Sequence, residues 1–324
     1  MALASRKKII IGLLVILLLC VLPQVRGSTQ REEGEISIVF DFSHNATYSV
    51  TRQNFTEAIS YFVDYPEYQI RILEDGILTA ANLSRSHILV IPNPMENYST
   101  SELDVISEYV RHGGSIFLLS DYQTTRRPIG NPIAVNMILQ RLTEARIEFT
   151  TFSSGNNSEG DAIIDLENSR ILPYNVEVNN SYFYSQLNRE TLVTGINSVI
   201  VAGGSLTTDD SNLIISSGAE TSQAVALSGE VIQNQPGWLS AFRIGSSRIV
   251  LCSSTTMFSD TTCAGTNQSW FQSLDNRVLW LNIFRWMSID LVQDPTQIMI
   301  IFVAIVLVAG IVVFAYSLWQ TKRE

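Results

Sequence analysis

The sequence predicts a doubly wound α/β domain with a mostly parallel sheet, a β-rich later half and one C-terminal transmembrane helix. In residues 87–122, two apolar runs flank an amphipathic helix, which is typical of a βαβ crossover between parallel strands. Strand and helix signals alternate from residue 36 to residue 149, as they do in doubly wound folds. A third observation, the apolar run from Ile298 to Leu318, predicts the transmembrane helix.

The first elements follow from local patterns. The apolar run 36–41 is predicted to be the first strand, and it ends on Asp41. A helix is expected over residues 51–62, where aromatic and aliphatic residues recur at helical spacing. Residues 68–72 alternate between apolar and polar, so we expect a strand near an edge of the sheet.

The central crossover has the clearest boundaries. Strand 88–91 precedes a Ser-Thr-Ser run at 99–101, whose members are candidate helix N-caps, and acidic residues follow in the first turn. The glycine pair 113–114 is expected to end the helix and turn the chain into strand 115–120. Another helix is expected over residues 132–142.

The later half has a different character. After a strand at 147–149, the segment 160–290 has short strand signals and few helical stripes, so we expect a β-rich extension. Its elements are predicted as strands at 198–202, 212–216, 224–227 and 249–252, and as a helix at 276–287. The strand 249–252 is expected to return to the main sheet. The helix precedes the membrane segment, so we expect it to dock a partner there.

The amino-terminal end of the chain, residues 1–27, is predicted to be a secretory signal peptide. Arg6, Lys7 and Lys8 precede a short apolar run, and small residues suited to signal peptidase follow. An uncleaved anchor is the alternative, although the run is shorter than the ~20 residues of a spanning helix.

At the other end, residues 295–318 are predicted to span the membrane and residues 319–324 to form a cytoplasmic tail, since Lys322 and Arg323 suit the inner side. The body, residues 28–294, would consist of a core at 35–150 and the extension. We therefore expect a single-pass type I membrane protein with its body at the cell surface or in the ER lumen.

The composition of the body limits its partners. It carries about fifteen net negative charges, which argues against nucleic acid and anionic lipid as partners. Its histidines and cysteines do not occur at zinc spacing, and no nucleotide-binding glycine motif appears. No metal or cofactor is therefore predicted.

Two kinds of covalent modification are predicted outside the cytoplasm. Acceptor motifs for N-glycosylation begin at Asn45, Asn54, Asn82, Asn97, Asn156, Asn179 and Asn267. Only Cys252 and Cys263 lie in the body, and their spacing permits a disulfide. Two free thiols are the alternative.

A ligand crevice is expected where the parallel strands end. Open parallel sheets bind ligands at the carboxyl ends of their strands, so the loops after three strands should face one crevice. Its polar side chains would be Asp41, His44, Asn93, Glu96, Asp121 and Arg126. An Asp41–His44 pair has the chemistry of a proton-transfer site, because a carboxylate orients an imidazole that moves protons. A loop held by local hydrogen bonds is the alternative.

Several segments carry a resemblance to a known family. They are residues 40–44, 91–94, 101–102, 109–115, 248–254 and 257–260, and the helix up to Trp286. Together they resemble the class I glutamine-amidotransferase-like (flavodoxin-like) fold over roughly residues 35–290. The nearest forms are two non-enzymatic relatives. One is a domain of unknown function from membrane-anchored prokaryotic proteins; the other is the GIFT domain of an intraflagellar transport protein and the oligosaccharyltransferase 48 kDa subunit.

The resemblance implies a protein without amidotransferase activity. In the enzymatic members, a cysteine follows the strand after the Gly-Gly pair, and a histidine and a glutamate assist it; here that turn reads Leu119-Ser120-Asp121-Tyr122. The oligosaccharyltransferase subunit has a second β-rich domain before its membrane helix, and this chain lacks it. The resemblance thus implies a non-catalytic scaffold, with an accessory subunit of an N-glycosylation complex as its foremost form. The alternatives are a small-ligand-binding or hydrolytic surface protein that uses the crevice around Asp41 and His44, and a cell-surface protein of unknown function like the prokaryotic relatives.

Overall fold

The computed structural model describes residues 35–124, 127–128, 130–142, 147–154, 157–184, 190–226 and 228–289, together with Gly310 and Trp319. Among these residues, no helix combines the length and apolar character that crossing a bilayer requires. The expected signal peptide at 1–27, and the expected transmembrane helix at 295–318 except Gly310, lie outside the described residues.

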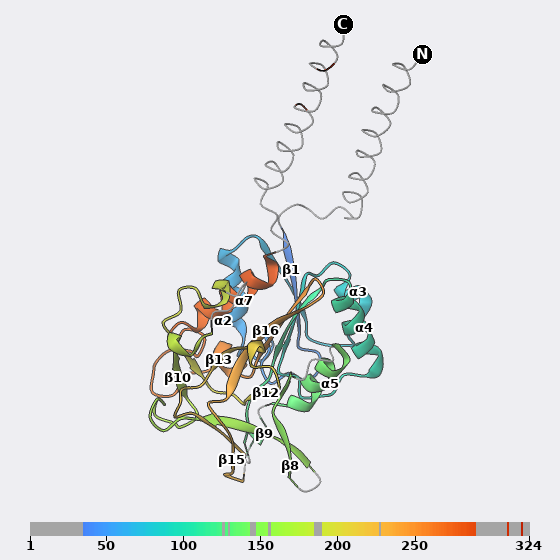
Figure 1. Ribbon diagram of the computed structural model, residues 1–324. Coiled ribbons are helices and arrows are strands. Elements are labelled where there is room, and N and C mark those ends of the chain that lie inside the picture. The colour runs from blue at the N-terminus through green and yellow to red at the C-terminus, as the bar shows by residue number, and fades with distance from the viewer. Residues whose placement is uncertain are drawn as a thin grey trace, which may run out of the picture. The chain divides into compact units, whose positions relative to one another are not determined.

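A central sheet organises the domain (Figure 1). Its parallel strands are β1 (Ile36–Asp41), β2 (Tyr68–Leu73), β3 (Ile88–Pro92), β4 (Ser115–Leu119) and β17 (Ser247–Cys252). Antiparallel strands complete it: β7 (Ile147–Phe149), β12 (Leu206–Thr208), β13 (Ile214–Ser217) and β16 (Gly237–Ile244). The order is β2-β1-β3-β4-β17-β16-β12-β7, with β13 beside β16. The mixed α/β class is confirmed, and β2 lies at the predicted edge.

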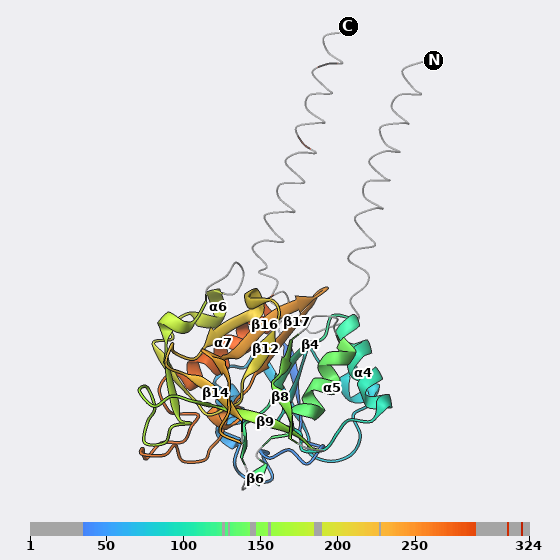
Figure 2. The same cartoon turned by 60° about the horizontal axis from the view of Figure 1, so that its bottom comes forward.

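Helices cover both faces of the parallel strands, as in a doubly wound fold (Figures 1 and 2). One face carries α3 (Ala80–Leu83), α4 (Thr100–Arg111) and α5 (Pro132–Leu142); the other carries α2 (Thr56–Ser60) and α7 (Asn276–Ser288). Strand side chains alternate between the two layers, so Leu89 packs with the α4 layer and Val90 with the α7 layer.

The crossover helix α4 forms as predicted. Ser99 is its N-cap, and Ser99 and Glu102 form a capping box in which each side chain binds the other residue's backbone N–H. Gly113, with a φ of 94°, provides the left-handed turn into β4. The expected helix 51–62 is shorter in the structure, where α2 begins at Thr56 and continues as a 3₁₀ helix, η2 (Tyr61–Asp64). Asp260 sets this start by accepting hydrogen bonds from the N–H groups of Thr56 and Glu57.

The later half is β-rich, as predicted. A four-stranded antiparallel sheet contains β8 (Thr151–Ser154), β9 (Asn157–Ile164), β14 (Gln223–Ala226) and β15 (Val231–Asn234). Small pairs are β5 (Gln123–Thr124) with β6 (Arg127–Pro128), and β10 (Val176–Asn179) with β11 (Ser198–Val201). The short helix α6 (Glu190–Val193) packs against α7. The strand predicted at 249–252 returns to the main sheet as β17, parallel to β4.

The expectation that helix 276–287 docks a partner is wrong. Ten of the thirteen residues of α7 are buried within the domain. The Trp280 ring contacts seven phenylalanine rings, among them Phe40, Phe117 and Phe284. An apolar stripe occurs both in helices that pack on their own core and in helices that bind a partner, so the sequence stripe alone could not separate the two roles.

Candidate functional site at the strand carboxyl ends

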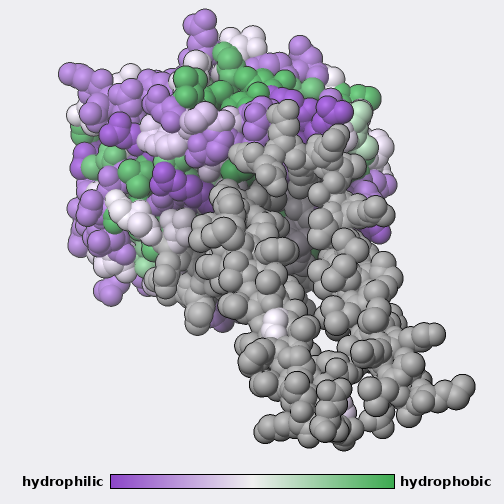
Figure 3. Space-filling model, turned by 90° about the horizontal axis from the view of Figure 1, so that it is seen from above, coloured by the Kyte–Doolittle hydropathy of each residue, from purple (hydrophilic) through white to green (hydrophobic). Residues whose placement is uncertain are grey.

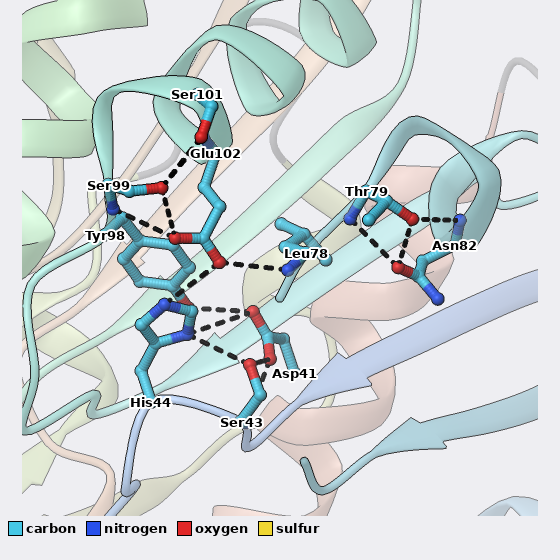
Figure 4. A network of polar contacts seen from close by, with 10 residues as sticks. All are labelled: Asp41, Ser43, His44, Leu78, Thr79, Asn82, Tyr98, Ser99, Ser101 and Glu102. Atoms are coloured by element: carbon cyan, nitrogen blue, oxygen red, sulfur yellow. Dashed lines mark hydrogen bonds and ion pairs between the residues drawn. The ribbon is translucent and has the colours of Figure 1, made fainter. Parts of the chain in front are cut away.

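The candidate site lies at the point where the strand order reverses. From β1, the chain crosses to β2 on one side, and it then returns to β3 on the other side. In open α/β sheets, this switch point is the usual place for a ligand crevice. Asp41 ends β1, the 93–98 loop follows β3, and the amino end of α4 lies beside them (Figure 4).

His44 lies between two carboxylates in this crevice (Figure 4). Its Nε2 is 3.2 Å from Glu102 Oε1, and its Nδ1 is 3.8 Å from Asp41 Oδ2. The imidazole stacks on the Tyr98 ring at a centroid distance of 3.7 Å, and His44 is only 8% exposed. The sequence placed His44 near Asp41, and the structure confirms that proximity.

Asp41 is held by two hydroxyl groups. Ser43 Oγ donates to Asp41 Oδ1 at 2.5 Å and lies 3.0 Å from His44 Nδ1, and Tyr98 Oη donates to Oδ2 at 2.9 Å. Burial raises the pKa of Tyr98 well above its usual value, and the neighbouring Asp41 charge adds to this shift. Tyr98 therefore remains a neutral donor.

Glu102 joins the crevice to the helix cap. Its Oε1 accepts from the Leu78 N–H at 2.9 Å, and its Oε2 accepts from Ser99 N–H and Oγ at 2.9 and 2.6 Å. Burial raises its pKa, but the Ser99 hydrogen bonds, the Leu78 N–H and His44 outweigh burial, so the net pKa is lowered. Glu102 is thus an ionised, fully oriented carboxylate.

Both ring nitrogens of His44 have a partner in this cluster. Nε2 lies 3.2 Å from Glu102 Oε1, and Nδ1 lies 3.0 Å from Ser43 Oγ, whose own proton goes to Asp41. Neighbouring side chains thus occupy the imidazole on both sides. The cluster therefore has the character of a structural clamp between β1 and α4.

Asp121 lies in a separate buried cluster. Its carboxylate accepts hydrogen bonds from the backbone N–H and Oγ1 of Thr256, and the Tyr48 hydroxyl is 2.7 Å from the same Oγ1. Burial raises the pKa of Asp121 well above its usual value, although the Thr256 hydrogen bonds oppose this shift. The structure does not pair this residue with His44, so the expected crevice divides into two clusters.

The other predicted site residues have diverse positions. Asn93 is fully buried, with a φ of 53°, at the turn after β3. Gly130 packs on it so closely that a Cβ there would lie 2.8 Å from Asn93 Oδ1 and from the Asp121 carbonyl oxygen. Glu96 is exposed, and only its backbone N–H contacts His44. Arg126 lies outside the described residues.

Ser120 follows β4, at the position where the enzymatic family carries its nucleophile. Its side chain is 1% exposed, and its Oγ has no hydrogen-bond partner among the described residues. A hydroxyl needs an adjacent base to act as a nucleophile. Among the described residues, none lies in position to activate the Ser120 hydroxyl.

The sequence analysis did not identify several members of the clusters as site residues, among them Tyr98, Glu102 and Thr256. Glu102 was visible only as an acidic first-turn residue, and its capping pattern with Ser99 was the available signal. Thr256 contacts Asp121 although 135 positions separate them in the sequence, and no local pattern predicts such a contact.

The predicted modification sites fall into groups. Asn45, Asn97, Asn179 and Asn267 are exposed, Asn54 and Asn82 are half-buried, and Asn156 lies outside the described residues. The Asn54 amide is engaged, because it donates to the Thr47 carbonyl and accepts from the Ser49 N–H. Both Cys252 and Cys263 are buried free thiols, so the structure has the two free thiols that were the alternative to a disulfide.

Other features of the described surface include two larger pockets away from the crevice. One, of about 390 Å³, lies between α2 and the start of α7 and is lined by Glu57, Tyr61 and Arg277 among others. The second, of about 400 Å³, lies along β12, β13 and β16. No group of three metal-ligating side chains occurs among the residues that the structure describes.

Fold and site together define a doubly wound α/β domain with an antiparallel extension and a buried polar clamp at its switch point. No family model and no curated protein matches the sequence. Among solved structures, the chain is similar to the N-terminal domain of mmIFT52, with a TM-score of 0.58 and 15% identity over 78% of this chain and 97% of that chain.

Two ThuA-like proteins are also similar. The one from Parabacteroides merdae ATCC 43184 has a TM-score of 0.45 and 11% identity over 79% of this chain and 90% of that chain. The one from Bacteroides uniformis ATCC 8492 has a TM-score of 0.41 and 10% identity over 81% of this chain and 94% of that chain. At these identities the likeness concerns the fold alone.

Proposed function

We propose that this protein is a non-catalytic, membrane-anchored scaffold whose α/β body binds other membrane proteins outside the cytoplasm. The sequence resemblance makes a complex of the N-glycosylation machinery the first partner to test, with this chain as an accessory subunit. The body is the domain described above, and the anchor is the apolar run 298–318.

The observation that carries the proposal is that the polar groups at the switch point are already engaged with one another. Asp41 is bound by Ser43 and Tyr98, Glu102 by Ser99 and Leu78, and Asp121 by Thr256. Catalytic groups need a free lone pair or proton within reach of a substrate. A crevice filled by its own hydrogen bonds favours binding through the outer surface.

A protease that cleaves after lysine gives a sharp test of the anchor. Residues 28–294 contain fifteen arginines and no lysine, whereas Lys322 lies in the predicted tail. In sealed cells, we expect an epitope placed after Glu324 to survive external protease and to be lost after detergent is added, while the body stays whole. Loss of the epitope from sealed cells would contradict the predicted topology.

The partner is tested by mild detergent purification of the full-length chain followed by mass spectrometry. We expect a multi-span membrane protein to co-purify, and its recovery to fall when residues 295–318 are replaced by an unrelated spanning sequence. The exchange leaves α7 intact, because Trp280 and Phe284 are core residues whose loss would confuse misfolding with loss of binding. A chain recovered alone would contradict the scaffold role.

A second candidate function, hydrolysis, is favoured by one observation. Ser43 Oγ, His44 and Glu102 form a hydroxyl–imidazole–carboxylate chain with contacts of 3.0 and 3.2 Å. This function requires that a fluorophosphonate probe label the native protein and that Ser43→Ala abolish labelling, with Ser120→Ala as the matched control. The scaffold proposal expects that the probe labels neither the native protein nor the Ser120→Ala variant.

A further inference from the structure

The contacts of each side-chain amide separate the glycosylation motifs of this chain into those that suit a sugar and those that do not. An N-linked sugar is bonded to the amide nitrogen, Nδ2, and the amide oxygen remains able to accept hydrogen bonds. The folded chain therefore accommodates a sugar at an asparagine whose Nδ2 has no partner in the fold, whatever its oxygen contacts.

Asn45 and Asn97 meet this requirement, and both are exposed. Asn45 Oδ1 accepts a hydrogen bond from Arg52 Nη2 at 2.6 Å, and Asn97 Oδ1 accepts one from Asn131 Nδ2 at 3.4 Å. Arginine has only donors, and the Asn131 oxygen already accepts from the Ala134 N–H, so both contacts engage the acceptor oxygen. Neither Nδ2 has a hydrogen-bond partner among the residues that the structure describes.

Asn54 does not meet the requirement. It is half-buried, its Nδ2 donates to the Thr47 carbonyl at 3.2 Å, and its Oδ1 accepts from the Ser49 N–H at 2.8 Å. A sugar on Nδ2 would have to open the loop that these two hydrogen bonds close. This motif therefore provides a contrast within the same chain.

Asn45 and Asn97 lie on either side of the polar clamp. Asn45 follows His44 in the sequence and Asn97 precedes Tyr98, and the two rings between them stack at a centroid distance of 3.7 Å (Figure 4). The Glu96 N–H donates to the His44 carbonyl at 3.2 Å, which joins the two loops. Backbone geometry then keeps the Cα atoms of Asn45 and Asn97 within about 11 Å of each other. Sugars on both would rise from the same rim of the crevice.

The opposite edge of the sheet lies away from these two asparagines. β1 begins there and runs for six residues, which separates the two edges by about 20 Å. The described surface on that side mixes hydrophilic and hydrophobic residues (Figure 3). Sugars on Asn45 and Asn97 would leave it uncovered.

We propose that Asn45 and Asn97 carry N-linked oligosaccharides that together cover the crevice at the switch point, whereas Asn54 carries none. The inference rests on the proposed location outside the cytoplasm. It deepens the scaffold role, because a covered crevice directs partner binding to other surfaces of the body.

The modification requires a donor of one chemical class, an oligosaccharide joined through its anomeric carbon to a lipid phosphate. The bond between that carbon and the phosphate oxygen breaks, and the lipid phosphate leaves with the electron pair. The carbon bonds to Nδ2, which releases one proton. No net oxidation or reduction occurs, so the transfer requires no further reactant.

Occupancy is measured by mass spectrometry of tryptic glycopeptides from the full-length chain, purified from the cells that naturally make it. Cleavage after arginine places the three asparagines in separate peptides, 32–52, 53–71 and 86–111. We expect peptides 32–52 and 86–111 to carry sugar in most molecules and peptide 53–71 to carry none.

Carbodiimide labelling of the exposed Glu96 carboxylate measures whether the sugars cover the crevice. We expect labelling to rise severalfold in the variant with Asn45→Gln and Asn97→Gln. These motifs are removed at their asparagines because Ser99, which belongs to the second, caps α4. The control with Asn179→Gln and Asn267→Gln removes two motifs elsewhere and should leave Glu96 labelling unchanged.

Thermal unfolding establishes that both variants are folded, and the two single variants, Asn45→Gln and Asn97→Gln, replace the double variant if it is not. Each single variant should give part of the rise in labelling. Equal labelling of Glu96 with and without the two motifs would overturn the covering role.

The occupancy pattern separates this inference from the proposed function. Sugar at other motifs with Asn45 and Asn97 bare would overturn the cover while the location outside the cytoplasm stands. Sugar on Asn54 would overturn the assignment from amide contacts. A chain without sugar at any motif would overturn the inference as a whole, and the protease test of topology then decides separately whether the body lies outside the cytoplasm.

Discussion

Thr256 and Asp121 show how single contacts across long sequence distances hold the candidate site together. The Thr256 hydroxyl donates to the buried carboxylate of Asp121, and it also contacts the Tyr48 hydroxyl. A buried polar group that loses its partner costs the full desolvation penalty. This position is therefore a sensitive probe of the buried cluster.

We expect Thr256→Val to lower the free energy of unfolding by about 1–3 kcal/mol, because it leaves the Asp121 carboxyl and the Tyr48 hydroxyl short of a partner. Thr256→Ser, which keeps the hydroxyl, should cost clearly less. Urea unfolding followed by fluorescence gives both values. Equal losses in the two variants would contradict the special importance of the hydroxyl, because only Thr256→Val removes it.

Glu102 should make stability depend on pH. Because its pKa is lowered in the folded state, it stabilises the fold fully above its unfolded value of about 4.5, and this stabilisation is lost as pH falls through the folded pKa. Glu102→Gln should therefore cost about 1–3 kcal/mol at neutral pH and progressively less below the unfolded pKa.

Urea unfolding at a series of pH values measures this difference. Glu108→Gln is the matched control, since Glu108 lies on the exposed face of the same helix. A Glu102→Gln cost that stayed constant down to acid pH would contradict the assignment of an ionised, clamped carboxylate.

At the scale of elements, α7 is the main support of one face of the sheet. Its Trp280 and Phe284 rings meet aromatic residues from β1, β2 and β4 and the N-cap residue of α2, Phe55, so it joins elements from the first half of the domain. The sequence predicted this helix and its apolar stripe, but not what the stripe contacts. Amphipathicity defines which face is buried, whereas tertiary packing decides the partner.

Phe284→Ala should lower the free energy of unfolding by about 3–5 kcal/mol, because truncation of a fully buried ring leaves a cavity. Val278→Ala on the same helix is the control, and its side chain is only partly buried, so its cost should be smaller. Denaturant unfolding compares the two. A similar small cost at both positions would contradict the central role of α7.

For the whole molecule, the α/β class, the crossover, the edge position of β2 and the return of β17 were all predictable from sequence. Each depends on a local pattern: apolar runs, a capping box and a glycine stop. The division of the crevice into two clusters was not predictable, because it depends on Thr256 and on Gly130, which packs between Asn93 and Asp121. Such contacts arise only when distant segments meet.

The net charge of the whole body should also affect its stability. Self-repulsion among surplus carboxylates opposes folding and is screened by salt. We expect the melting temperature to rise as sodium chloride is added from low concentration to about 1 M, where the Debye length is about 3 Å. A melting temperature that fell with salt would indicate that ion pairs such as Arg170–Glu177 outweigh the repulsion.

The position of β17 has a consequence for synthesis of the chain. β17 lies in the middle of the sheet, between β4 and β16, although it is synthesised long after β4. While the ribosome produces residues 120–246, the outer edge of β4 has no strand beside it and the Phe117 face has no α7 to cover it. Folding of the first half must therefore wait for the last, and the nascent chain exposes an apolar sheet edge that chaperones would have to protect.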